Sequence, residues 1–451
     1  MKPWEVSGRD AVLLTDLYEL KMVQACWKEG LQAEAVFSLH YRTLPRNRSF
    51  MLACGLDDVL SYLERLRFQP DHLEWLNTIP DLRPEFVEWL QDFRFTGDVR
   101  ALPEGTPVFP GEPLLEIEAP LPQAQMVESY VMNQIHHQTV VASKAVRVVL
   151  AARGRPVVDF GLRRMHGMDA ALKAARAFHM AGVTATSNVL AGRVYGLPIT
   201  GTMAHSYIQA HDDELAAFRA FSELYPETVL LVDTYDTLEG VRKVVALAKA
   251  LGRDFRITGI RIDSGDLAEL AHSARRMLDA AGLSGVRIFV SGGLDEEGVA
   301  ALVRSGAPID AFGVGTRMGV SSDAPDLDMA YKLVSYAGRP RIKVSPGKHL
   351  LPGSKQVFRV AGEGRATHDI LALDGESCPG RPLLVPVMEH GRRIAPEATD
   401  LEASRERARL EIGLLPPHLL DTEGGGKPYR VELSDGLKEL NARLSADHGA
   451  R

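Results

Sequence analysis

The stretch RIDSGD, residues 261–266, contains two carboxylates three positions apart and an arginine two positions before the first of them. Carboxylate oxygens are preferred ligands of Mg²⁺, and a guanidinium group binds phosphate oxygens in a fixed geometry. The pattern is therefore suited to holding a magnesium-bound diphosphate through Asp263 and Arg261. The alternative is structural: Asp266 caps a following helix while Arg261 and Asp263 pair with neighbours. We expect the cap for Asp266 and the functional role for the other two.

His205 follows the largely apolar run ITGTMA, residues 199–204, at the point where a predicted strand gives way to a turn. An imidazole at a strand end can serve as base, acid or nucleophile. The alternative is a neutral core histidine bonded to a carbonyl group. We favour the chemical role because of the placement after a strand. His136, His137 and His211 lack such a placement, and we interpret them as structural.

Two short glycine motifs, SGG at 291–293 and GVGT at 313–316, end the last two predicted strands. Glycine lets backbone N–H groups approach an anion, and a helix that follows adds a partial positive charge. The motifs suggest a sugar phosphate site. The alternative is that they are only tight turns joining strand to helix.

Arg163 and Arg164 follow another predicted strand. Two adjacent side chains of an extended chain point to opposite faces, so we expect one arginine to bind an anion and the other to brace the rim of a pocket. The alternative is a pair of surface salt bridges.

The elements that carry these residues follow one rhythm from Asp159 to about Gly338: a short β-rich run, a turn, then an amphipathic segment of helical period. This rhythm predicts parallel βα units. Predicted helices are 237–252, 266–282 and 296–307. Predicted strands are PVVDFG, GVTATSN, LPITGT, VLLVDTY, ITGIRIDSG, VRIFVSGG and AFGVGT. Because these are about seven, one fewer than the eight of a full barrel, we expect an irregular or incomplete α/β barrel.

The carboxyl ends of parallel strands meet at one rim of a barrel, so residues after each strand should surround one pocket. The candidate residues at these ends are Phe160, Gly161, Arg163, Arg164, Ser187, Asn188, Thr202, His205, Asp233, Tyr235, Asp236, Arg261, Asp263, Ser264, Gly265, Asp266, Ser291, Gly292, Gly293, Gly313, Gly315, Thr316 and Arg317.

The segments before and after these βα units lack their repeating pattern of strand, turn and helix. Residues 1–140 combine a helical stretch near 56–66 with an aromatic-rich run and short strands punctuated by Pro and Gly, and we assign them to a first domain. The barrel domain then occupies 141–340. Residues 341–451 carry weak periodicity and a charged helix, ATDLEASRERARLEIG, and we expect this C-terminal region to pack back on the first domain and complete it.

Composition narrows the class of protein. The 451 residues are 45% apolar, with 52 basic and 59 acidic residues, a formal charge of −7 and no long basic run, which makes nucleic acid an unsuitable partner. The chain lacks an apolar leader and any run of roughly 18 apolar residues, so we expect a cytoplasmic protein and no membrane partner. Three distant cysteines support neither a disulfide framework nor a zinc site.

Eight motifs occur in the order found in a known family. They are TDLYELKM at 15–22, FGLRR at 160–164, TSNVLAG at 186–192, GTMAHS at 201–206, RIDSGD at 261–266, SGG at 291–293, FGVGT at 312–316 and LPGSK at 351–355. Together they resemble the nicotinate phosphoribosyltransferase family over about residues 12–360. The resemblance implies a type II phosphoribosyltransferase fold: the barrel, an N-terminal α/β sandwich domain, and a homodimer whose active site is shared between subunits.

The resemblance also implies the reaction. Nicotinate and 5-phosphoribosyl 1-diphosphate give nicotinate mononucleotide and diphosphate in NAD salvage, with Mg²⁺ and with ATP hydrolysis through a phosphohistidine at His205. An enzyme of this ligase or glycosyltransferase type would stack the pyridine ring between Phe160 and Tyr18 of the neighbouring subunit, with Thr202 close to the ring. Arg261 would lie near the nicotinate carboxylate or the ribosyl diphosphate.

Further roles follow from the same resemblance. Asp263 would bind Mg²⁺ and Arg163 an anionic substrate. Phosphate groups would contact Ser264, Gly265, Gly292, Gly293, Gly313, Gly315 and Thr316. An acidic side chain, Asp212, Asp213 or Asp236, could orient the imidazole of His205. Ser187 occupies the position of an aspartate in nicotinamide-using relatives, and its hydroxyl suits a carboxylate that an aspartate would repel.

Two alternatives remain open. A nicotinamide phosphoribosyltransferase would share the fold and most of the motifs, and only the choice of base separates it from the nicotinate enzyme. A non-catalytic ribonucleotide-binding protein could use the same barrel, because a fold does not fix an activity. A barrel isomerase or aldolase would need a lysine or a carboxylate base at a strand end, and no predicted strand end offers a lysine.

Overall fold

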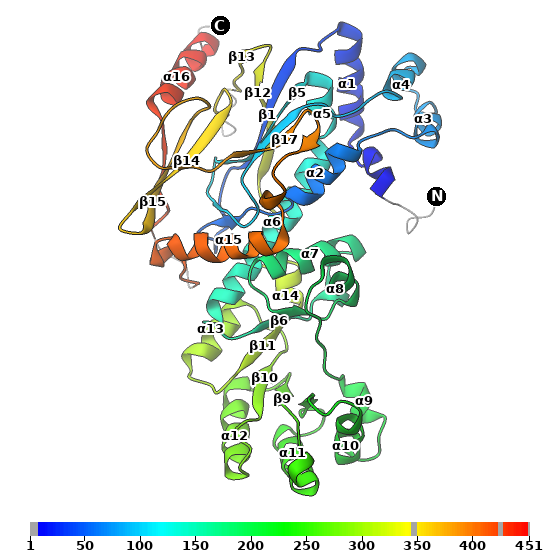
Figure 1. Cartoon of the computed structure of the whole chain (residues 1–451), viewed down its shortest axis with the longest axis vertical. Helices are drawn as coiled ribbons and strands as arrows, with labels where there is room; N and C mark the ends of the chain where they lie inside the picture. The colour runs from blue at the N-terminus through cyan, green and yellow to red at the C-terminus, as the bar shows by residue number, and fades with distance from the viewer. Residues whose placement is uncertain (1–7, 344–349, 423–426, 450–451) are drawn as a thin grey trace. The chain divides into compact units, whose positions relative to one another are not determined.

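A computed structural model describes residues 8–343, 350–422 and 427–449 of the chain (Figure 1). These residues form two compact units. Unit 1 contains the described residues up to Val140, Asp326–Leu420 and those from 427 onward, and unit 2 contains Val141–Pro325 with residues 421–422. The boundary at residue 140 falls inside one long helix, α6 (Glu128–Ala151).

Unit 2 is built on a parallel six-stranded sheet in the order β7-β6-β11-β10-β9-β8. Its strands are β6 (Val157–Asp159), β7 (Ala185–Thr186), β8 (Val229–Leu231), β9 (Gly259–Ile262), β10 (Arg287–Val290) and β11 (Ala311–Val314). The order begins at β7 and ends at β8, so the sheet is open, and the prediction of an incomplete α/β barrel is confirmed.

One predicted strand is wrong. The run LPITGT contributes only a single parallel bridge, between Ile199 and Thr186. Around this bridge the amide of Thr186 donates to the carbonyl of Pro198 and the amide of Thr200 donates to the carbonyl of Thr186. Pro198 has no N–H to extend the ladder, and the chain leaves the sheet after these two bonds. Residues up to Ala204 then run without regular structure to α9 (His205–Gln209).

Four helices of unit 2, one directly before β8 and one after each of β8, β9 and β10, share one kind of beginning. Asp213, Asp236, Asp266 and Asp295 are the N-caps of α10 (Glu214–Leu224), α11 (Thr237–Leu251), α12 (Leu267–Ala280) and α13 (Glu296–Arg304). In each case a carboxylate oxygen accepts a backbone N–H of the first turn, which lacks an intrahelical partner. The caps fix where each helix begins after its strand. The predicted helices 237–252, 266–282 and 296–307 are confirmed to within three residues at their ends.

Unit 1 contains a seven-stranded sheet in the order β13-β12-β1-β5-β3-β17-β18. The strands are β1 (Glu34–Tyr41), β3 (Asp98–Ala101), β5 (Pro113–Pro120), β12 (Met329–Tyr336), β13 (Arg339–Pro340), β17 (Val385–Glu389) and β18 (Arg392–Arg393). β17 comes from the C-terminal region 341–451 and pairs with β3. β12, at the end of the segment that was predicted as barrel, pairs with β1 and belongs to unit 1. The prediction that the C-terminal segment packs back on the first domain is therefore confirmed.

Helices cover this sheet and enclose the core of unit 1. They include α1 (Leu17–Glu29), α2 (Leu56–Arg65), α3 (Pro70–Leu76), α4 (Pro84–Leu90) and α5 (Leu121–Met126). On α2 the apolar residues Leu56, Val59, Leu60 and Leu63 recur at helical spacing and are all buried. They join one large cluster with residues of β1, β3 and β5.

A second sheet of unit 1 has the order β16-β14-β15-β19. Its strands are β14 (Lys355–Gly362), β15 (Arg365–Leu373), β16 (Arg381–Pro382) and β19 (Val431–Leu433), and the helices α15 (Leu401–Leu414) and α16 (Asp435–Gly449) belong to the same part of the chain. The predicted charged helix is α15. β2 (Met51–Leu52) and β4 (Pro107–Val108) form a two-stranded ladder.

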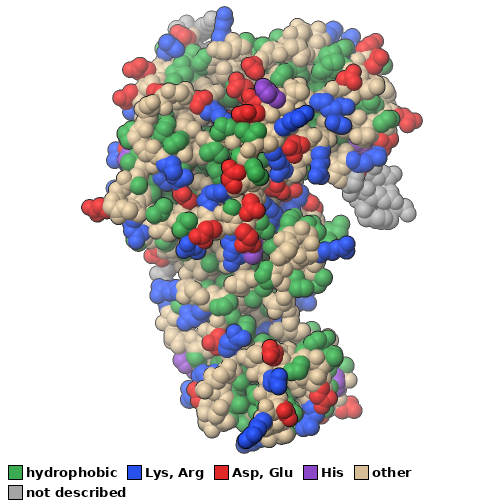
Figure 2. Space-filling model, in the orientation of Figure 1, with side chains coloured by type: hydrophobic (Ala, Val, Ile, Leu, Met, Phe, Trp, Pro, Cys, Tyr) green, Lys and Arg blue, Asp and Glu red, His purple; other side chains and the backbone are tan. Residues whose placement is uncertain are grey.

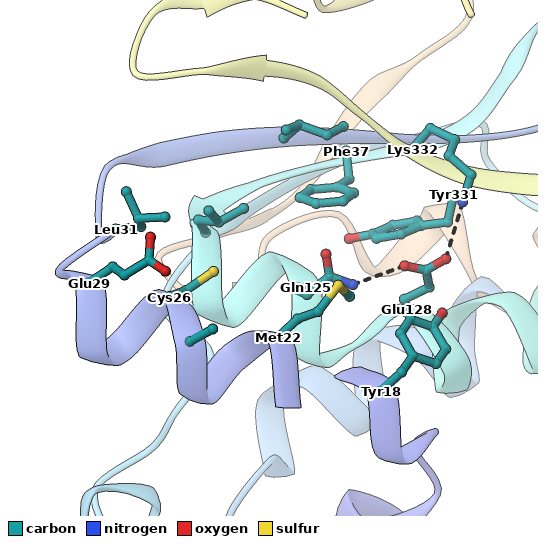
Figure 3. Close-up of a pocket in the computed structure, with 13 residues that line it drawn as sticks. Tyr18, Met22, Cys26, Glu29, Leu31, Phe37, Gln125, Glu128, Tyr331 and Lys332 are labelled. Carbon is teal, nitrogen blue, oxygen red and sulfur yellow. Dashed lines mark hydrogen bonds and ion pairs between the residues drawn. The ribbon is translucent and has the colours of Figure 1, made fainter. Parts of the chain in front are cut away.

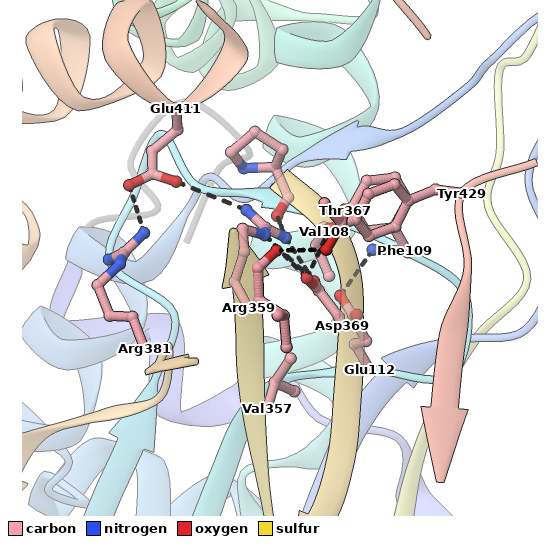
Figure 4. A network of polar contacts seen from close by, with 12 residues as sticks. Val108, Phe109, Glu112, Val357, Arg359, Thr367, Asp369, Arg381, Glu411 and Tyr429 are labelled. Atoms are coloured by element: carbon pink, nitrogen blue, oxygen red, sulfur yellow. Dashed lines mark hydrogen bonds and ion pairs between the residues drawn. The ribbon is translucent and has the colours of Figure 1, made fainter. Parts of the chain in front are cut away.

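A buried polar network ties this second sheet to the segment between β4 and β5 (Figure 4). Arg359 Nη2 donates to Asp369 Oδ2 at 2.7 Å and to the carbonyl of Pro107 at 2.9 Å. The hydroxyl of Tyr429 donates to Asp369 Oδ1 at 2.8 Å. Glu112 in the same network is fully buried, and one of its oxygens accepts the amide of Phe109. Residues far apart in the sequence thus meet in one set of buried charges.

Acidic and basic side chains are interspersed over the visible face of the chain (Figure 2). Among the described residues, no helix has the length and apolarity that crossing a membrane requires.

Candidate active site

A cavity of about 390 Å³ in unit 2 gathers residues from the carboxyl ends of its strands. It is lined by Phe160, Leu162, Arg163, Arg164, Ser187, Gly201, Thr202, Met203, Ala204, His205, Arg261, Asp263, Ser291, Gly292, Gly293, Leu294, Gly313, Gly315 and Thr316. The strand ends therefore surround one cavity, as the parallel arrangement requires. Of the predicted site residues, Ser264 and Gly265 belong to the adjoining loop, and Tyr18 belongs to unit 1 on α1. The other strand-end candidates that do not line the cavity are Gly161, Asn188, Asp233, Tyr235, Asp236, Asp266 and Arg317.

Arg261, in β9, is held in a fixed orientation. Its Nη1 donates to the hydroxyl of Thr202 at 2.6 Å and its Nη2 donates to the carbonyl of Met203 at 3.0 Å. Burial lowers the pKa of Arg261, while Asp263 and Asp233 act in the opposite direction. Nε is buried and has no hydrogen-bond partner among the described residues. The guanidinium thus keeps an N–H that a ligand could use.

The ring of Phe160 lies beside this arginine. The guanidinium carbon of Arg261 is 5.8 Å from the ring centroid, within the range of a cation–π contact. On the next strand, a Cβ at Gly313 would lie 2.5 Å from Cε2 of Phe160, so only glycine leaves room for the ring. Phe160 and Arg261 together form a surface that can hold a planar anion by stacking and by charge.

The loop after β9 contains the acidic part of the cavity. Asp233 Oδ2 accepts the amide of Asp263 at 2.9 Å and the hydroxyl of Ser264 at 2.6 Å. The hydroxyl of Ser291 donates to Asp263 Oδ1. Asp266 caps α12, which confirms the structural role predicted for it. The two acids of RIDSGD therefore separate into one that lines the cavity and one that begins a helix.

This acidic loop meets the requirements of a magnesium ion that arrives with phosphates. No group of three or more His, Cys, Asp or Glu side chains within the described ranges has the arrangement of a metal site. An Mg²⁺ ion bound together with phosphates needs only one or two carboxylates from the protein. Asp233 Oδ1 is buried without a partner among the described residues, and Asp263 lines the cavity beside it. This pair fits such an ion.

His205 opens α9 and lines the cavity. Its Nδ1 lies 3.1 Å from the hydroxyl oxygen of Thr234, in the loop three residues after β8. The prediction that an aspartate orients the ring is therefore wrong for Nδ1. Asp213 and Asp236 instead use a carboxylate oxygen to cap α10 and α11. Each of these aspartates stands directly before the first residue of its helix, which is the position typical of an N-cap.

The glycine motifs owe part of their composition to packing. Gly292 has a φ of 94°, and a Cβ there would lie 1.8 Å from the carbonyl oxygen of Asp263. A Cβ at Gly315 would lie 3.0 Å from the carbonyl oxygen of Phe160. Close approach of neighbouring loops therefore requires glycine at Gly292 whether or not a phosphate binds. The two motifs nonetheless line the same cavity as His205.

Arg163 and Arg164 depart from the prediction of opposite faces. Both lie in a 3₁₀ turn, η3 (Leu162–Arg164), rather than in extended chain, and both line the cavity. Successive side chains of a 3₁₀ turn are about 120° apart, since it has about three residues per turn. Arg164 Nη1 donates to the hydroxyl of Thr316 at 3.2 Å, which ties this turn to the loop after β11.

Sequence reasoning missed two residues that shape the site. Thr234 stands within the predicted strand-end motif VLLVDTY but was not assigned a role. Asp159 is the last residue of β6 and is 1% exposed. The available signal was a lone carboxylate at the end of an otherwise apolar strand, PVVD. A buried charge needs hydrogen-bond partners, and such a requirement usually reports a structural or functional constraint.

The fold and the site together define a half-barrel protein whose cavity combines stacking, anion-binding and phosphate-compatible groups. Two family models match the chain: the nicotinate phosphoribosyltransferase N-terminal domain over residues 13–136 and the nicotinate phosphoribosyltransferase family over residues 156–345. A nicotinate phosphoribosyltransferase of Mycobacterium tuberculosis is 54% identical over 432 residues, covering 96% of this chain and 93% of the relative. One from Bacillus subtilis is 38% identical over 374 residues, covering 81% and 76%.

The likeness extends to a solved structure. The crystal structure of human nicotinic acid phosphoribosyltransferase matches with a TM-score of 0.85 at 30% sequence identity, covering 95% of this chain and 99% of that one. The chain belongs to the nicotinate phosphoribosyltransferase family and is an enzyme of the transferase class.

Proposed function

We propose that this enzyme transfers the 5-phosphoribosyl group from 5-phosphoribosyl 1-diphosphate to nicotinate, giving nicotinate mononucleotide and diphosphate for NAD salvage. One arrangement carries the proposal: Arg261, anchored by Thr202 and Met203, lies over Phe160 within the cavity that the glycine loops also line. A planar anion and a sugar phosphate are the two ligand types that this combination suits.

The nicotinate ring stacks on Phe160, and its carboxylate is held by the Arg261 guanidinium and the Ser187 hydroxyl. Ring and carboxylate together fix the direction of the pyridine nitrogen. That nitrogen attacks C1 of the ribose as diphosphate leaves from the opposite face, so that no protein nucleophile is needed at C1. The side chains of the chain act by orientation and charge rather than by covalent chemistry.

The ribosyl diphosphate lies over Asp263 and the two glycine loops, with Arg163 and Thr316 toward its phosphates. Asp233 Oδ1, which is buried and has no hydrogen-bond partner in the part of the chain that the structure describes, supports this location, because a cation brought by the diphosphate would satisfy it. Bound Mg²⁺ supplies neutralisation of the charge that develops on the leaving diphosphate. Asp263 and Asp233 would hold it.

The direct test is product analysis with the purified full-length chain. Nicotinate, ribosyl diphosphate and Mg²⁺ are incubated with and without ATP, and the mononucleotide and diphosphate are quantified by chromatography. We expect equimolar nicotinate mononucleotide and diphosphate. Binding of the ribosyl diphosphate without mononucleotide from any pyridine base would support a non-catalytic binding protein instead, and a preference for nicotinamide would identify the amide-using alternative.

We further propose that ATP phosphorylates His205 and that this step is coupled to transfer. The support is the location of His205 at the cavity, where a phosphoryl group on the ring would lie beside the ribosyl diphosphate. The added negative charge would help to retain the magnesium ion and order the adjacent loops. None of the three cysteines, Cys26, Cys54 and Cys378, forms a disulfide, which suits the reducing cytoplasm that we assign to the enzyme.

Two copies of the chain form the working enzyme in this proposal. On α1, Leu14 precedes the helix and is followed at helical spacing by Leu17, Tyr18 and Met22, which are all between 38% and 52% exposed. Tyr18 and Met22 border a cavity of about 440 Å³ in unit 1, together with the stacked rings of Phe37 and Tyr331 (Figure 3). An exposed apolar stripe beside an aromatic cavity is typical of a protein interface.

The second copy is the occupant we assign to this stripe, because unit 2 exposes one apolar residue that lines its own cavity, Leu162, and two that lie close in sequence to lining residues, Val189 and Ile199. Leu162, Val189 and Ile199 are 41%, 69% and 55% exposed. Tyr18 of one copy would then cover the nicotinate that stacks on Phe160 of the other.

Met22→Glu should separate the copies, because it introduces a charge into the stripe. We expect a sedimentation coefficient that falls from dimer to monomer and a loss of transferase activity. Leu410→Glu is the matched control, since it makes the same change at a half-exposed apolar position on α15. A wild-type chain that sediments as a monomer while fully active contradicts the shared site.

A further inference from the structure

We infer that Asp159 is a positioning residue that fixes Phe160 and Ser187, and with them the part of the cavity that binds the pyridine base. The inference rests on the proposed function, because it assigns the base to these two residues. Asp159 itself does not line the cavity, so it acts through its neighbours.

Both oxygens of the Asp159 carboxylate accept hydrogen bonds from other groups of the protein. Oδ1 accepts the amide of Gly161 at 2.8 Å, and Oδ2 accepts the hydroxyl of Thr186 at 2.7 Å. Burial raises the pKa of Asp159, and these two hydrogen bonds lower it. A carboxylate that is 1% exposed needs such bonds to be tolerated, so the surrounding backbone is held where the bonds are made.

The bond to Gly161 restrains Phe160. A side-chain oxygen that accepts the amide two residues further on closes an Asx turn, and the residue in the middle loses its freedom of φ and ψ. Phe160 is that middle residue. Its own amide donates to the carbonyl of Val314 at 2.9 Å, and its ring lies against Gly313. The turn and the strand contact therefore direct the ring to one place.

The bond to Thr186 restrains Ser187. The amide of Ser187 donates to the carbonyl of Asp159 at 2.9 Å, and the hydroxyl of Thr186 accepts the amide of Asn188 at 3.1 Å. Asp159 in β6 thus bonds directly to Thr186 and Ser187, and through the Thr186 hydroxyl it also restrains Asn188 on the other side of Ser187. The stacking ring and the hydroxyl assigned to the base are set by the same carboxylate.

The chemistry explains why this position needs a carboxylate rather than an amide. Both groups that face Asp159 are donors in this arrangement, and a carboxylate offers acceptors to each of them. In Asp159→Asn the amide nitrogen faces one donor. If this nitrogen faces Thr186, the hydroxyl oxygen of Thr186 meets two N–H donors, one from the new amide and one from the backbone of Asn188. The hydroxyl proton of Thr186 then has lost the carboxylate oxygen that accepted it.

Steady-state kinetics of the full-length enzyme separate positioning from general stability. Asp159→Asn and Thr186→Val should each raise KM for nicotinate about tenfold, the effect of losing one hydrogen bond to a charged group. KM for the ribosyl diphosphate should change less than about twofold, because its assigned contacts are elsewhere. The double variant should be no worse than the more severe single variant, since both remove the same bond.

Two further variants control the experiment. Thr186→Ser keeps the hydroxyl and should restore KM for nicotinate to near the wild-type value. Thr184→Val makes the same change two residues before Thr186. It removes a hydroxyl that donates to the carbonyl of Val157 at 2.8 Å, and it should leave both KM values unchanged. Thermal unfolding of every variant shows whether it is folded.

Calorimetric titration of nicotinate gives the same comparison without turnover. Normal nicotinate binding and KM in Thr186→Val, or equal increases of both KM values in all variants, would overturn the positioning role alone. A wild-type enzyme that neither binds nicotinate nor forms the mononucleotide would overturn the proposed function and this inference together.

Discussion

At the scale of single residues, His205 is held by a hydroxyl and not by a carboxylate. In the tautomer whose Nδ1 donates to the hydroxyl of Thr234, Nε2 is unprotonated and is the nitrogen that could accept a phosphoryl group. A hydroxyl suits this position because it can act as a donor or as an acceptor. A carboxylate at this point would instead favour the protonated imidazolium, which cannot act as a nucleophile.

His205→Ala should abolish the acid-labile phosphoenzyme and the stimulation by ATP, and leave slow transfer without ATP. Thr234→Val should lower the rate of phosphorylation about tenfold by releasing the ring, whereas Thr234→Ser should retain it. Labelling with γ-phosphate-labelled ATP measures the first effect, and mononucleotide formation with and without ATP measures the second. Full ATP stimulation in His205→Ala would remove its assigned role.

Ser187 is the residue at which we expect the choice between acid and amide to be made. Its hydroxyl can donate to the nicotinate carboxylate, and a carboxylate placed there would repel the acid and accept the amide N–H of nicotinamide. Ser187→Asp should therefore lower kcat/KM for nicotinate by about a hundredfold or more, with nicotinamide less affected. Kinetics with both bases provide the measurement, and Ser187→Ala serves as the neutral control. Equal loss for both bases would contradict the assignment.

At the scale of elements, the aspartates of unit 2 have two uses that look alike in the sequence. Asp266 begins α12, where it accepts the amides of Ala268 and Glu269, while Asp263 of the same turn lines the cavity. Backbone geometry makes this division, since a carboxylate can reach the first-turn amides only from the position directly before the helix.

Asp266→Ala should lower the stability of unit 2 by about 1 kcal/mol, as the loss of an N-cap does, with activity largely kept. Asp263→Ala should do the reverse: activity falls by orders of magnitude and the unfolding temperature stays near that of the wild type. Scanning calorimetry and transfer assays on both proteins give the comparison. The interpretation fails if the two substitutions produce the same pattern.

At the scale of the whole molecule, the buried network of unit 1 joins segments from three parts of the chain. Burial raises the pKa of Glu112 well above its ordinary value, and the neighbouring Asp369 raises it further. Arg359 acts against this rise, and its own pKa is raised by Asp369 despite burial. Glu112 therefore keeps its proton to a higher pH in the folded chain than in the unfolded chain.

The sign of the resulting pH dependence follows from this difference. A group whose folded pKa is raised contributes full stability below the unfolded pKa, about 4.3 for glutamate, and the contribution is lost as pH rises toward the folded value. Glu112→Gln mimics the protonated form and does not titrate. Its stability relative to the wild type should therefore increase with pH, by up to about 1.4 kcal/mol per pH unit in that interval.

Thermal unfolding of wild type and Glu112→Gln between about pH 4 and 9 provides the measurement. Glu406→Gln is the control, because Glu406 pairs with Arg409 at the exposed surface of α15 and should give a pH profile parallel to the wild type. Parallel profiles for Glu112→Gln would show that Glu112 titrates normally.

The sequence by itself determined the βα rhythm of unit 2, three of the helices that follow its strands, and most of the strand-end residues that line one cavity. These follow from short-range causes: hydrophobic period, capping residues, and the fact that parallel strands end at one edge. The motifs also determined the family. The prediction of a strand at LPITGT was wrong. The composition of this run favours a strand, but Pro198 and the path of the chain allow only one bridge.

Only the tertiary structure decided which groups contact one another across these elements. These contacts depend on the direction of side chains and on distances in space. Examples are the contact of His205 with Thr234, the hydrogen bonds of Asp159 with Gly161 and Thr186, and the buried polar network around Asp369. A one-dimensional pattern carries the type and spacing of residues but not these directions. Contacts between distant segments depend on how the whole chain packs, and packing is settled only when all the elements are in place.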